Sequence, residues 1–316
     1  MDSKTHVYDT IIMGSGPAGY SAGLYSVRAN LDTLLFKGNQ PGGALTTTLD
    51  VENFIGLDKE NGFDLVEKFR IHAESYGLQT REGQVDSVEK VPTGELEIFK
   101  IQVGKEVYHA KTVIVATGAT AKRLGVQGEE LFWNKGISAC ATCDGALPMF
   151  RNKVLVVVGG GDTACEEALF LSRFASKVLL IHRRDRLRAS PIMQDRIRNN
   201  SKIEMVWNTC VIEVMGVDLL NSIRCQNVIT KAYSVVGTSG LFYAIGHVPN
   251  SQCLHAFDRE GLVDDQGYII TEPGSTRTVV SGLFAAGDVA DKVYRQAITS
   301  AGTGCMAALD VSDYLQ

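Results

Sequence analysis

The chain has 316 residues, of which 45% are hydrophobic and 21% charged, and its formal net charge is −5. This composition is ordinary for a soluble globular protein of about two domains, and the negative charge argues against nucleic acid as the main partner, since phosphate binding needs a basic surface. Because the sequence shows neither a bilayer-spanning apolar run nor a basic-then-apolar N-terminal signal, we expect no membrane association and a cytoplasmic location.

The first predicted elements form a βαβ unit. A strand-like segment at 10–13 leads into Gly14-Ser15-Gly16-Pro17-Ala18-Gly19, a helical pattern follows, and residues 33–36 form the next strand. In such a turn the glycines permit the tight bend, the close approach of a pyrophosphate and close helix packing, while the helix N-terminus attracts the phosphates. The pattern therefore predicts a dinucleotide site.

This first site lacks the acid that commonly binds a ribose after the second strand. The strand ends in Phe36-Lys37-Gly38. Asn39, Gln40 or the backbone would then contact the ribose. The prediction that the glycine turn binds the phosphates is unaffected.

Two other apolar segments stop at glycine turns. Residues 112–116 run into Thr117-Gly118-Ala119, and residues 282–286 run into Gly287-Asp288-Val289. Both patterns indicate buried strands that end at a turn of ligand size, although a plain strand and turn would look the same.

The pair Cys140 and Cys143 is the sharpest chemical feature. The chain has seven cysteines, an odd and scattered set unlike a disulfide framework, and only these two are close together. Their spacing lets both sulfurs meet within one helical turn, and such pairs often supply a thiolate at neutral pH. A zinc site would need a second pair, so no metal is expected. An inert buried pair fits the spacing but gives no role to Asp144, whose carboxyl can exchange protons with the thiols.

The βαβ order recurs in the middle of the chain, which indicates an internal duplication. A buried strand is expected at 153–158, then the turn Gly159-Gly160-Gly161-Asp162-Thr163-Ala164, a helix through 166–174 and a strand at 177–181. This predicts a second dinucleotide site.

Cations follow the second strand of this second site. They are His182, Arg183 and Arg184, with Arg188 a little later, and no carboxylate stands directly after the strand. Cations at this position accommodate a 2′-phosphate, so we expect NADPH rather than NADH, with a solvated basic loop as the alternative. The parts together suggest an electron path from NADPH through a flavin to the cysteine pair and on to an external disulfide.

These residues resemble the low-molecular-weight thioredoxin reductases over essentially the whole chain. The matching segments are GSGPAG at 14–19, LTTT at 45–48, VENF at 51–54, VIVATGA at 113–119, CATCDGA at 140–146, VVGGGDTACEEA at 157–168, HRRDRLRAS at 182–190, YAIGHVPN at 243–250, GLFAAGDV at 282–289 and RQAITSAGTGCMAA at 295–308. The motif CATCD between two nucleotide fingerprints is specific to that family.

The resemblance implies an α/β fold with two Rossmann-like domains, an NADPH domain at 121–248 being inserted into a discontinuous FAD domain at 1–120 and 249–316. It implies thioredoxin-disulfide reductase activity, thioredoxin as partner and a homodimer. Cys140 would attack the partner disulfide, Cys143 would face the flavin and Asp144 would handle protons. The implied FAD contacts are Gly14, Gly16, Pro17, Ala18, Asn53, Asp288, Arg295, Gln296 and Ala297. The implied NADPH contacts are Gly161, Asp162, Thr163, Arg183, Arg184 and Arg188. His182 is added as an expected contact because it stands directly after the second strand of this site.

The sequence departs from the family pattern at Ala44, where glutamine is usual, and at Ile55, where proline is usual. These changes affect the expected flavin affinity and local geometry more than the reaction. Because the cysteine pair and the NADPH site share one domain and the flavin belongs to the other, we expect the inserted domain to rotate about hinges near 119–122 and 245–250. His247 is interpreted as a structural residue of the hinge.

Three alternatives remain. The first is an NADPH-dependent flavin oxidase or reductase, although ferredoxin–NADP reductase-like proteins lack the cysteine pair. The second is a reductase of another disulfide partner, such as a glutaredoxin-like protein. The third is a nucleotide-binding regulatory protein, which would have no use for Cys140, Cys143 and Asp144.

Overall fold

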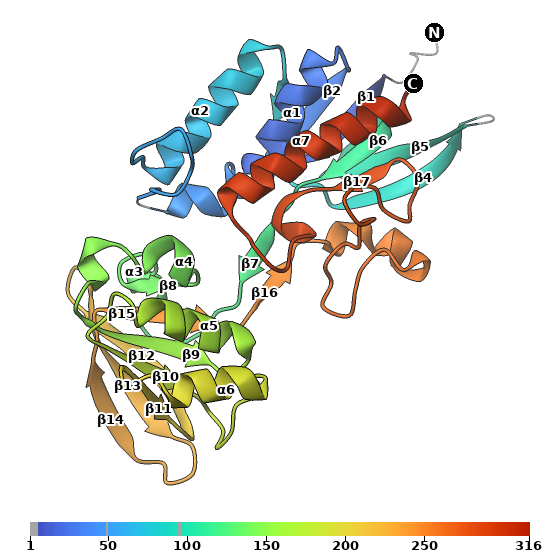
Figure 1. The fold of residues 1–316 in the computed structure, drawn as a ribbon. Helices are drawn as coiled ribbons and strands as arrows, with labels where there is room; N and C mark the ends of the chain where they lie inside the picture. The colour runs from blue at the N-terminus through green and yellow to red at the C-terminus, as the bar shows by residue number, and fades with distance from the viewer. Residues whose placement is uncertain (1–5, 49, 94–95) are drawn as a thin grey trace. The chain divides into compact units, whose positions relative to one another are not determined.

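A computed structural model describes residues 6–48, 50–93 and 96–316 (Figure 1). The chain divides into two compact units. The first consists of Met1–Thr120 with Val248–Gln316, and the second is Ala121–His247. The first unit is therefore discontinuous in sequence, and the second is inserted into it.

The first unit is built on a seven-stranded sheet of order β3-β2-β1-β6-β5-β4, with β17 also paired to β6. Its parallel strands are β1 (Val7–Met13), β2 (Thr33–Phe36), β3 (Gln79–Arg81), β6 (Glu106–Val115) and β17 (Leu283–Ala285). Antiparallel strands β4 (Ser87–Thr93) and β5 (Leu96–Val103) extend it.

Both faces of the central strands are covered, which explains their continuous apolar runs. Ile12 packs under a helical layer of α1 (Pro17–Arg28), α2 (Gly62–Ser75) and α7 (Ala297–Tyr314), visible on one side of this sheet in Figure 1. Its neighbours Ile11 and Met13 face the opposite side, where residues of the 3₁₀ segment η3 (Gln252–Glu260) join the core. The alternation follows from the two-residue period of a strand.

The second unit contains a parallel five-stranded sheet of order β11-β10-β9-β15-β8. The strands are β8 (Ile137–Ser138), β9 (Val154–Gly159), β10 (Lys177–Ile181), β11 (Ile203–Val206) and β15 (Gly240–Ala244). The helices are α3 (Glu129–Phe132), α4 (Ala141–Asp144), α5 (Asp162–Leu171) and α6 (Pro191–Arg198). An antiparallel sheet of β12 (Thr209–Gly216), β13 (Leu220–Asn227) and β14 (Tyr233–Gly237) shares a core with one face of the parallel sheet.

The chain passes between the units twice, through β7 (Ala119–Ala121) and β16 (His247–Pro249). These two short strands pair with each other. On one side of the pair, the amide of Lys122 donates to the carbonyl of Gly246 at 3.0 Å. On the other, the amide of Asn250 donates to the carbonyl of Gly118 at 3.0 Å.

The predicted α/β class is confirmed, and the strands expected at 33–36 and 177–181 have those bounds. The helix expected through 166–174 is wrong at both ends, because α5 spans Asp162–Leu171. It starts directly after Gly161, its N-cap, so that Asp162 and Thr163 lie in its first turn. It ends early because residues 172–174 close a tighter turn, in which the Phe174 amide donates to the Leu171 carbonyl at 3.0 Å.

Candidate functional site

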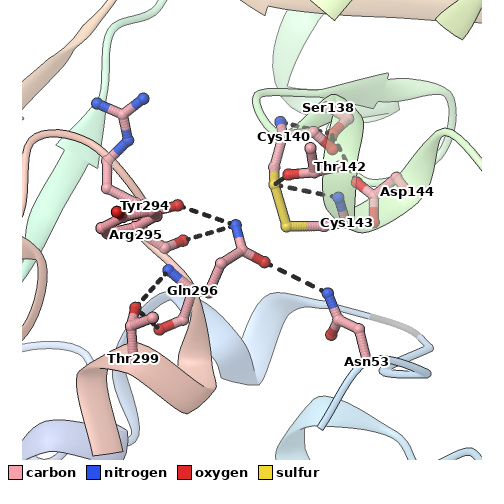
Figure 2. Close-up of a disulfide and its surroundings, with 10 residues drawn as sticks. All are labelled: Asn53, Ser138, Cys140, Thr142, Cys143, Asp144, Tyr294, Arg295, Gln296 and Thr299. Atoms are coloured by element: carbon pink, nitrogen blue, oxygen red, sulfur yellow. Dashed lines mark hydrogen bonds between the residues drawn. A yellow bond between two sulfur atoms is a disulfide. The ribbon is translucent and has the colours of Figure 1, made fainter. Parts of the chain in front are cut away.

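The cysteine pair follows the edge strand β8, which is paired in parallel with β15. Cys140 is the N-cap of α4, Cys143 lies in that helix, and a disulfide joins the two (Figure 2). The backbone amide of Cys143 donates to Cys140 Sγ at 3.2 Å. An amide aimed at this sulfur would also stabilise a thiolate there once the disulfide is reduced.

Asp144, the last residue of α4, is half-buried beside the pair. Burial raises the pKa of this carboxyl above its usual value, and a hydrogen bond from Ser138 lowers it. Ser138 Oγ lies 2.5 Å from Asp144 Oδ2. A carboxyl with a raised pKa holds its proton closer to neutral pH, which suits it to proton exchange with neighbouring thiols.

The first glycine turn has the form that a pyrophosphate requires. Gly14 has φ +108°, and a Cβ there would lie 2.3 Å from the Ala116 carbonyl oxygen. A Cβ on Gly19 would lie 1.9 Å from the Gly14 carbonyl oxygen, so neither position tolerates a side chain. At Gly16 the nearest atom would be 3.9 Å away, which leaves the backbone open, and no described side chain caps the helix that starts at Pro17. Its free amides can therefore receive phosphate.

Asp288 comes next to this turn through β17, which pairs with β6. A Cβ on Gly287 would lie 3.0 Å from Ala18 Cβ, so the turn after β17 closely approaches the start of α1. Asp288 Oδ1 accepts a hydrogen bond from Ser300 Oγ at 2.9 Å. Burial raises the pKa of Asp288, and the Ser300 hydroxyl lowers it. A half-buried carboxylate in the turn after a strand can accept hydrogen bonds from ligand hydroxyls.

The segment before α7 is held in a defined shape. Arg295 is left-handed, with φ +48°, and the carboxylate of Asp291 accepts backbone amides from residues 293–295. Gln296 is the N-cap of α7 and forms a capping box with Thr299. Asn53 Nδ2 donates to Gln296 Oε1 at 3.4 Å (Figure 2). The structure thus brings together Asn53 and Gln296, two expected FAD contacts distant in the sequence.

The second glycine turn repeats the pattern of the first. A Cβ on Gly159 would lie 2.5 Å from both Ala164 Cβ and the Ala244 carbonyl oxygen, whereas one on Gly161 would meet nothing within 4 Å. No described side chain caps α5, which begins at Asp162. The open backbone at Gly161 leads into free helix amides, so this turn also fits a pyrophosphate.

The four expected cationic residues divide into two environments. Arg183, Arg184 and Arg188 are exposed, as 2′-phosphate ligands should be. His182 is instead buried, with Nδ1 2.8 Å from the Gly159 carbonyl oxygen. Its ring fills the space that a Gly160 side chain would occupy, since a Cβ there would lie 2.2 Å from His182 Cε1. Burial lowers the pKa of His182, which favours the neutral ring. Because the ring is buried against Gly159 and Gly160, the structure places His182 as a support of the turn.

Three serines of the sites were missed by reasoning from the sequence. Ser15 Oγ donates to the Lys37 carbonyl and accepts the Gly42 amide, both at 2.8 Å. Ser190 donates its amide and hydroxyl to Asp162 Oδ1 at 2.8 and 2.7 Å, and Ser138 binds Asp144 as described above. The only signal was a small hydroxyl inside or beside a motif.

The two positions that depart from the family pattern are peripheral. Ala44 is exposed in the 3₁₀ turn η1 (Gly43–Thr47), and Ile55 is 84% exposed. Among the described residues, no cluster of three or more His, Cys, Asp or Glu could hold a metal. No helix in the described part of the chain is long and apolar enough to cross a membrane.

Two open glycine turns and a disulfide beside a half-buried carboxyl define a nucleotide-dependent disulfide oxidoreductase. The family model described as pyridine nucleotide-disulphide oxidoreductase matches residues 8–304. The chain belongs to this family of oxidoreductase enzymes.

Individual relatives match over the full length. Thioredoxin reductase 2 of Arabidopsis thaliana is 50% identical, over 100% of this chain and 84% of that protein. The thioredoxin reductase of Dictyostelium discoideum is 49% identical over 99% of both chains. The crystal structure of thioredoxin reductase from Streptococcus pyogenes superposes with a TM-score of 0.90 at 40% identity, covering 98% of each chain.

Proposed function

We propose that this protein is a thioredoxin-disulfide reductase that uses NADPH and FAD. The observation that carries the proposal is the Cys140–Cys143 disulfide next to Asp144, in the unit that also holds the second glycine turn. The full-length relatives named thioredoxin reductase support the same choice of substrate.

The residues around each glycine turn suit one cofactor. In the first unit FAD would be held by Gly14, Gly16, Pro17, Ala18, Asn53, Asp288, Arg295, Gln296 and Ala297. In the second unit NADPH would be held by Gly161, Asp162, Thr163 and the exposed arginines Arg183, Arg184 and Arg188, with His182 supporting the turn. When bound, FAD supplies the relay of electrons between the hydride of the nicotinamide and the disulfide.

The cysteines then carry the exchange with the partner. In the reduced enzyme the Cys140 thiolate attacks the disulfide of thioredoxin, forming a mixed disulfide and releasing one thioredoxin thiolate, which takes up a proton. Cys143 gives its proton to Asp144 and attacks Cys140 Sγ, which breaks the mixed disulfide, restores the enzyme disulfide and releases the second thioredoxin sulfur as a thiolate that takes up a proton from water. Two electrons pass to thioredoxin, and Asp144 exchanges the proton at the enzyme thiols.

The test is the loss of NADPH when the FAD-loaded protein is mixed with oxidised thioredoxin. The Cys143→Ser variant serves as control. Loss of NADPH that requires both thioredoxin and Cys143 supports the proposal. Loss that persists in the variant, with oxygen consumed instead, would move the protein to the flavin oxidases. Loss that requires Cys143 but occurs only with a glutaredoxin-like disulfide would change the partner and keep the chemistry.

The wider setting is proposed from the relatives alone. We infer a homodimer in the cytoplasm, with thioredoxin as its transient protein partner. Sedimentation of the FAD-loaded protein at assay concentration tests the dimer, and a monomer there would contradict it.

A further inference from the structure

Ser138 occupies a fixed place between the sheet of the second unit and the redox helix. It is the last residue of β8, is 3% exposed, and is paired in register with Phe242 of β15. The chain leaves the sheet at this residue and reaches Cys140 two positions later. A side chain here is therefore anchored to the sheet, whereas the disulfide and Asp144 lie beyond it on α4.

The Ser138 hydroxyl links Cys140 to Asp144. It donates to Asp144 Oδ2 at 2.5 Å and accepts the backbone amide of Cys140 at 3.0 Å (Figure 2). A hydroxyl can do both at once, since it carries one donor and two acceptor positions. The hydroxyl proton has two acceptors within reach, and Asp144 Oδ2 at 2.5 Å is nearer than the Cys140 carbonyl oxygen at 3.4 Å.

We propose that Ser138 is a positioning residue of the disulfide exchange, which holds the Asp144 carboxyl in place for proton transfer to and from the Cys140–Cys143 pair and stabilises the charged form that remains after this carboxyl gives up its proton. This rests on the proposed function and adds a residue to it. Ser138 itself touches neither partner nor cofactor in this assignment, and it acts through Asp144.

The Ser138 hydroxyl is the group that opposes the effect of burial on the pKa of Asp144. Burial raises the pKa of Asp144 and the Ser138 hydrogen bond lowers it, and no charged group among the described residues adds a third influence. The neighbouring helix α5 presents Phe170 and Leu171 to the adjacent Gly145, where a Cβ would lie 3.3 and 2.6 Å from them. The two thiols of the reduced pair belong to the same short helix and its N-cap as Asp144.

One proton moves between Asp144 and the cysteine pair each time two electrons enter or leave the pair. When two electrons reduce the disulfide, the S–S bond breaks and the protonated Asp144 gives its proton to one of the two sulfurs. The other sulfur stays a thiolate and attacks the external disulfide. When the remaining enzyme thiol closes the S–S bond again, its proton returns to the carboxylate, and the two external sulfurs leave as thiolates that take up protons from water. Without the hydroxyl, the carboxylate would hold this proton too tightly, because its charged form loses a hydrogen bond.

The experiment compares the FAD-loaded wild type with Ser138→Ala, Asp144→Asn and the double variant. Turnover of NADPH with oxidised thioredoxin is measured against pH. A second readout needs no nicotinamide: the rate at which iodoacetamide alkylates the chemically reduced pair, also against pH. The part of the pH profile that depends on Asp144 is the limb that Asp144→Asn abolishes. We expect Ser138→Ala to move this limb to higher pH, with turnover about tenfold lower on the acidic side of the limb. The effect is this large because a hydrogen bond to a charged group is stronger than one between neutral groups.

The double variant gives the sharpest outcome. If Ser138 acts through Asp144, Ser138→Ala should change nothing further in the Asp144→Asn background. Additive losses, or a Ser138→Ala profile that is lower but unshifted in pH, would overturn the proposal in favour of a purely structural serine. If the wild type fails to oxidise NADPH with thioredoxin, the proposed function fails instead, and the alkylation profiles still test the link between Ser138 and Asp144.

Two further variants serve as controls. Ser172 is a buried serine of the same unit, 6% exposed, whose hydroxyl donates to the Leu169 carbonyl at 2.8 Å. Ser172→Ala should leave both pH profiles unshifted. Ser138→Thr keeps the hydroxyl and should restore the wild-type position of the limb. If Ser172→Ala shifts the limb as much as Ser138→Ala does, the effect belongs to the unit as a whole and the proposal is wrong.

Discussion

A single carboxylate can hold a loop in this protein by accepting several hydrogen bonds from it. Asp310 on α7 accepts the hydroxyl of Ser275 at 2.8 Å and the amide and hydroxyl of Thr276 at 2.8 and 2.7 Å. Burial would raise the pKa of Asp310, but the hydrogen bonds from Thr276 and Ser275 and the charge of Arg277 outweigh it and hold the pKa below its usual value. The charged form therefore stabilises the fold.

Asp310→Asn should lower the free energy of unfolding by roughly 1–3 kcal/mol at neutral pH. Because the folded pKa lies below the unfolded one, the stabilisation is present above the unfolded pKa and is lost as the pH falls through the folded pKa. Urea midpoints at neutral and acidic pH measure this. The control is Asp313→Asn, which removes an exposed ion pair with Arg277 and should cost little. A loss in Asp310→Asn that is equal at both pH values would contradict the prediction.

At the residue scale the sequence predicted groups whose partners are adjacent in the chain. Cys140, Cys143 and Asp144 form one short motif, and their disulfide is present in the structure. Ser15 and Ser190 were missed because their partners lie 22 to 28 residues away and are brought to them only by the fold. Burial of His182 was also unforeseen, because its charge pattern is the same whether the ring points outward or inward.

At the scale of elements, helix α1 makes a close contact with helix α7. The contact depends on small residues. A Cβ on Gly304 of α7 would lie 2.1 Å from the carbonyl oxygen of Ala18, at the start of the helix that follows the first glycine turn. Gly302, two residues earlier on the same helix, is exposed, and a Cβ there would meet nothing within 4 Å.

Alanine substitutions at these two glycines should have opposite effects. Gly304→Ala should destabilise the protein by about 1–3 kcal/mol, because backbone atoms must move apart. Gly302→Ala should stabilise it by up to about 1 kcal/mol through helix propensity. Urea unfolding with flavin absorbance as a second probe checks both, since Gly304→Ala should also weaken FAD retention. Equal effects of the two substitutions would show that the close contact is not tight in solution.

Elements whose pattern is local were predictable. The strands at 33–36 and 177–181 were found because they are short apolar runs between polar turns. The start of α5 was missed because its first residues, Asp162 and Thr163, carry no apolar period, and the helix begins there on account of the preceding glycine turn. The antiparallel pairing of β4 with β5 was not predicted from the sequence.

At the scale of the whole molecule, the chain order separates the reacting groups. The disulfide and the second glycine turn lie in Ala121–His247, and the first turn with Asp288 lies in the other unit. A disulfide that is reduced by a flavin and then oxidised by a protein must meet two different partners. We therefore predict that the second unit rotates relative to the first about β7 and β16.

Cross-linking the two units in one arrangement should stop turnover but leave one half-reaction intact. Either flavin bleaching by NADPH or exchange between the reduced pair and thioredoxin should survive, because each needs only one arrangement. Rapid-mixing absorbance and thiol titration of a cross-linked sample, verified by mass spectrometry, measure the two halves. Full turnover in that sample would rule out the rotation.

The pairing of β7 with β16 also bears on how the second unit could have been inserted into the first, and on how the two units can be separated. The two ends of the inserted unit leave side by side, joined by the hydrogen bond from Lys122 to Gly246. An insertion whose ends are neighbours imposes almost no gap on its host, which is the geometry in which domain insertion is tolerated. The host unit could be rejoined from Thr120 to Val248 by a short turn, and the insert could be expressed or grafted elsewhere as a self-contained piece.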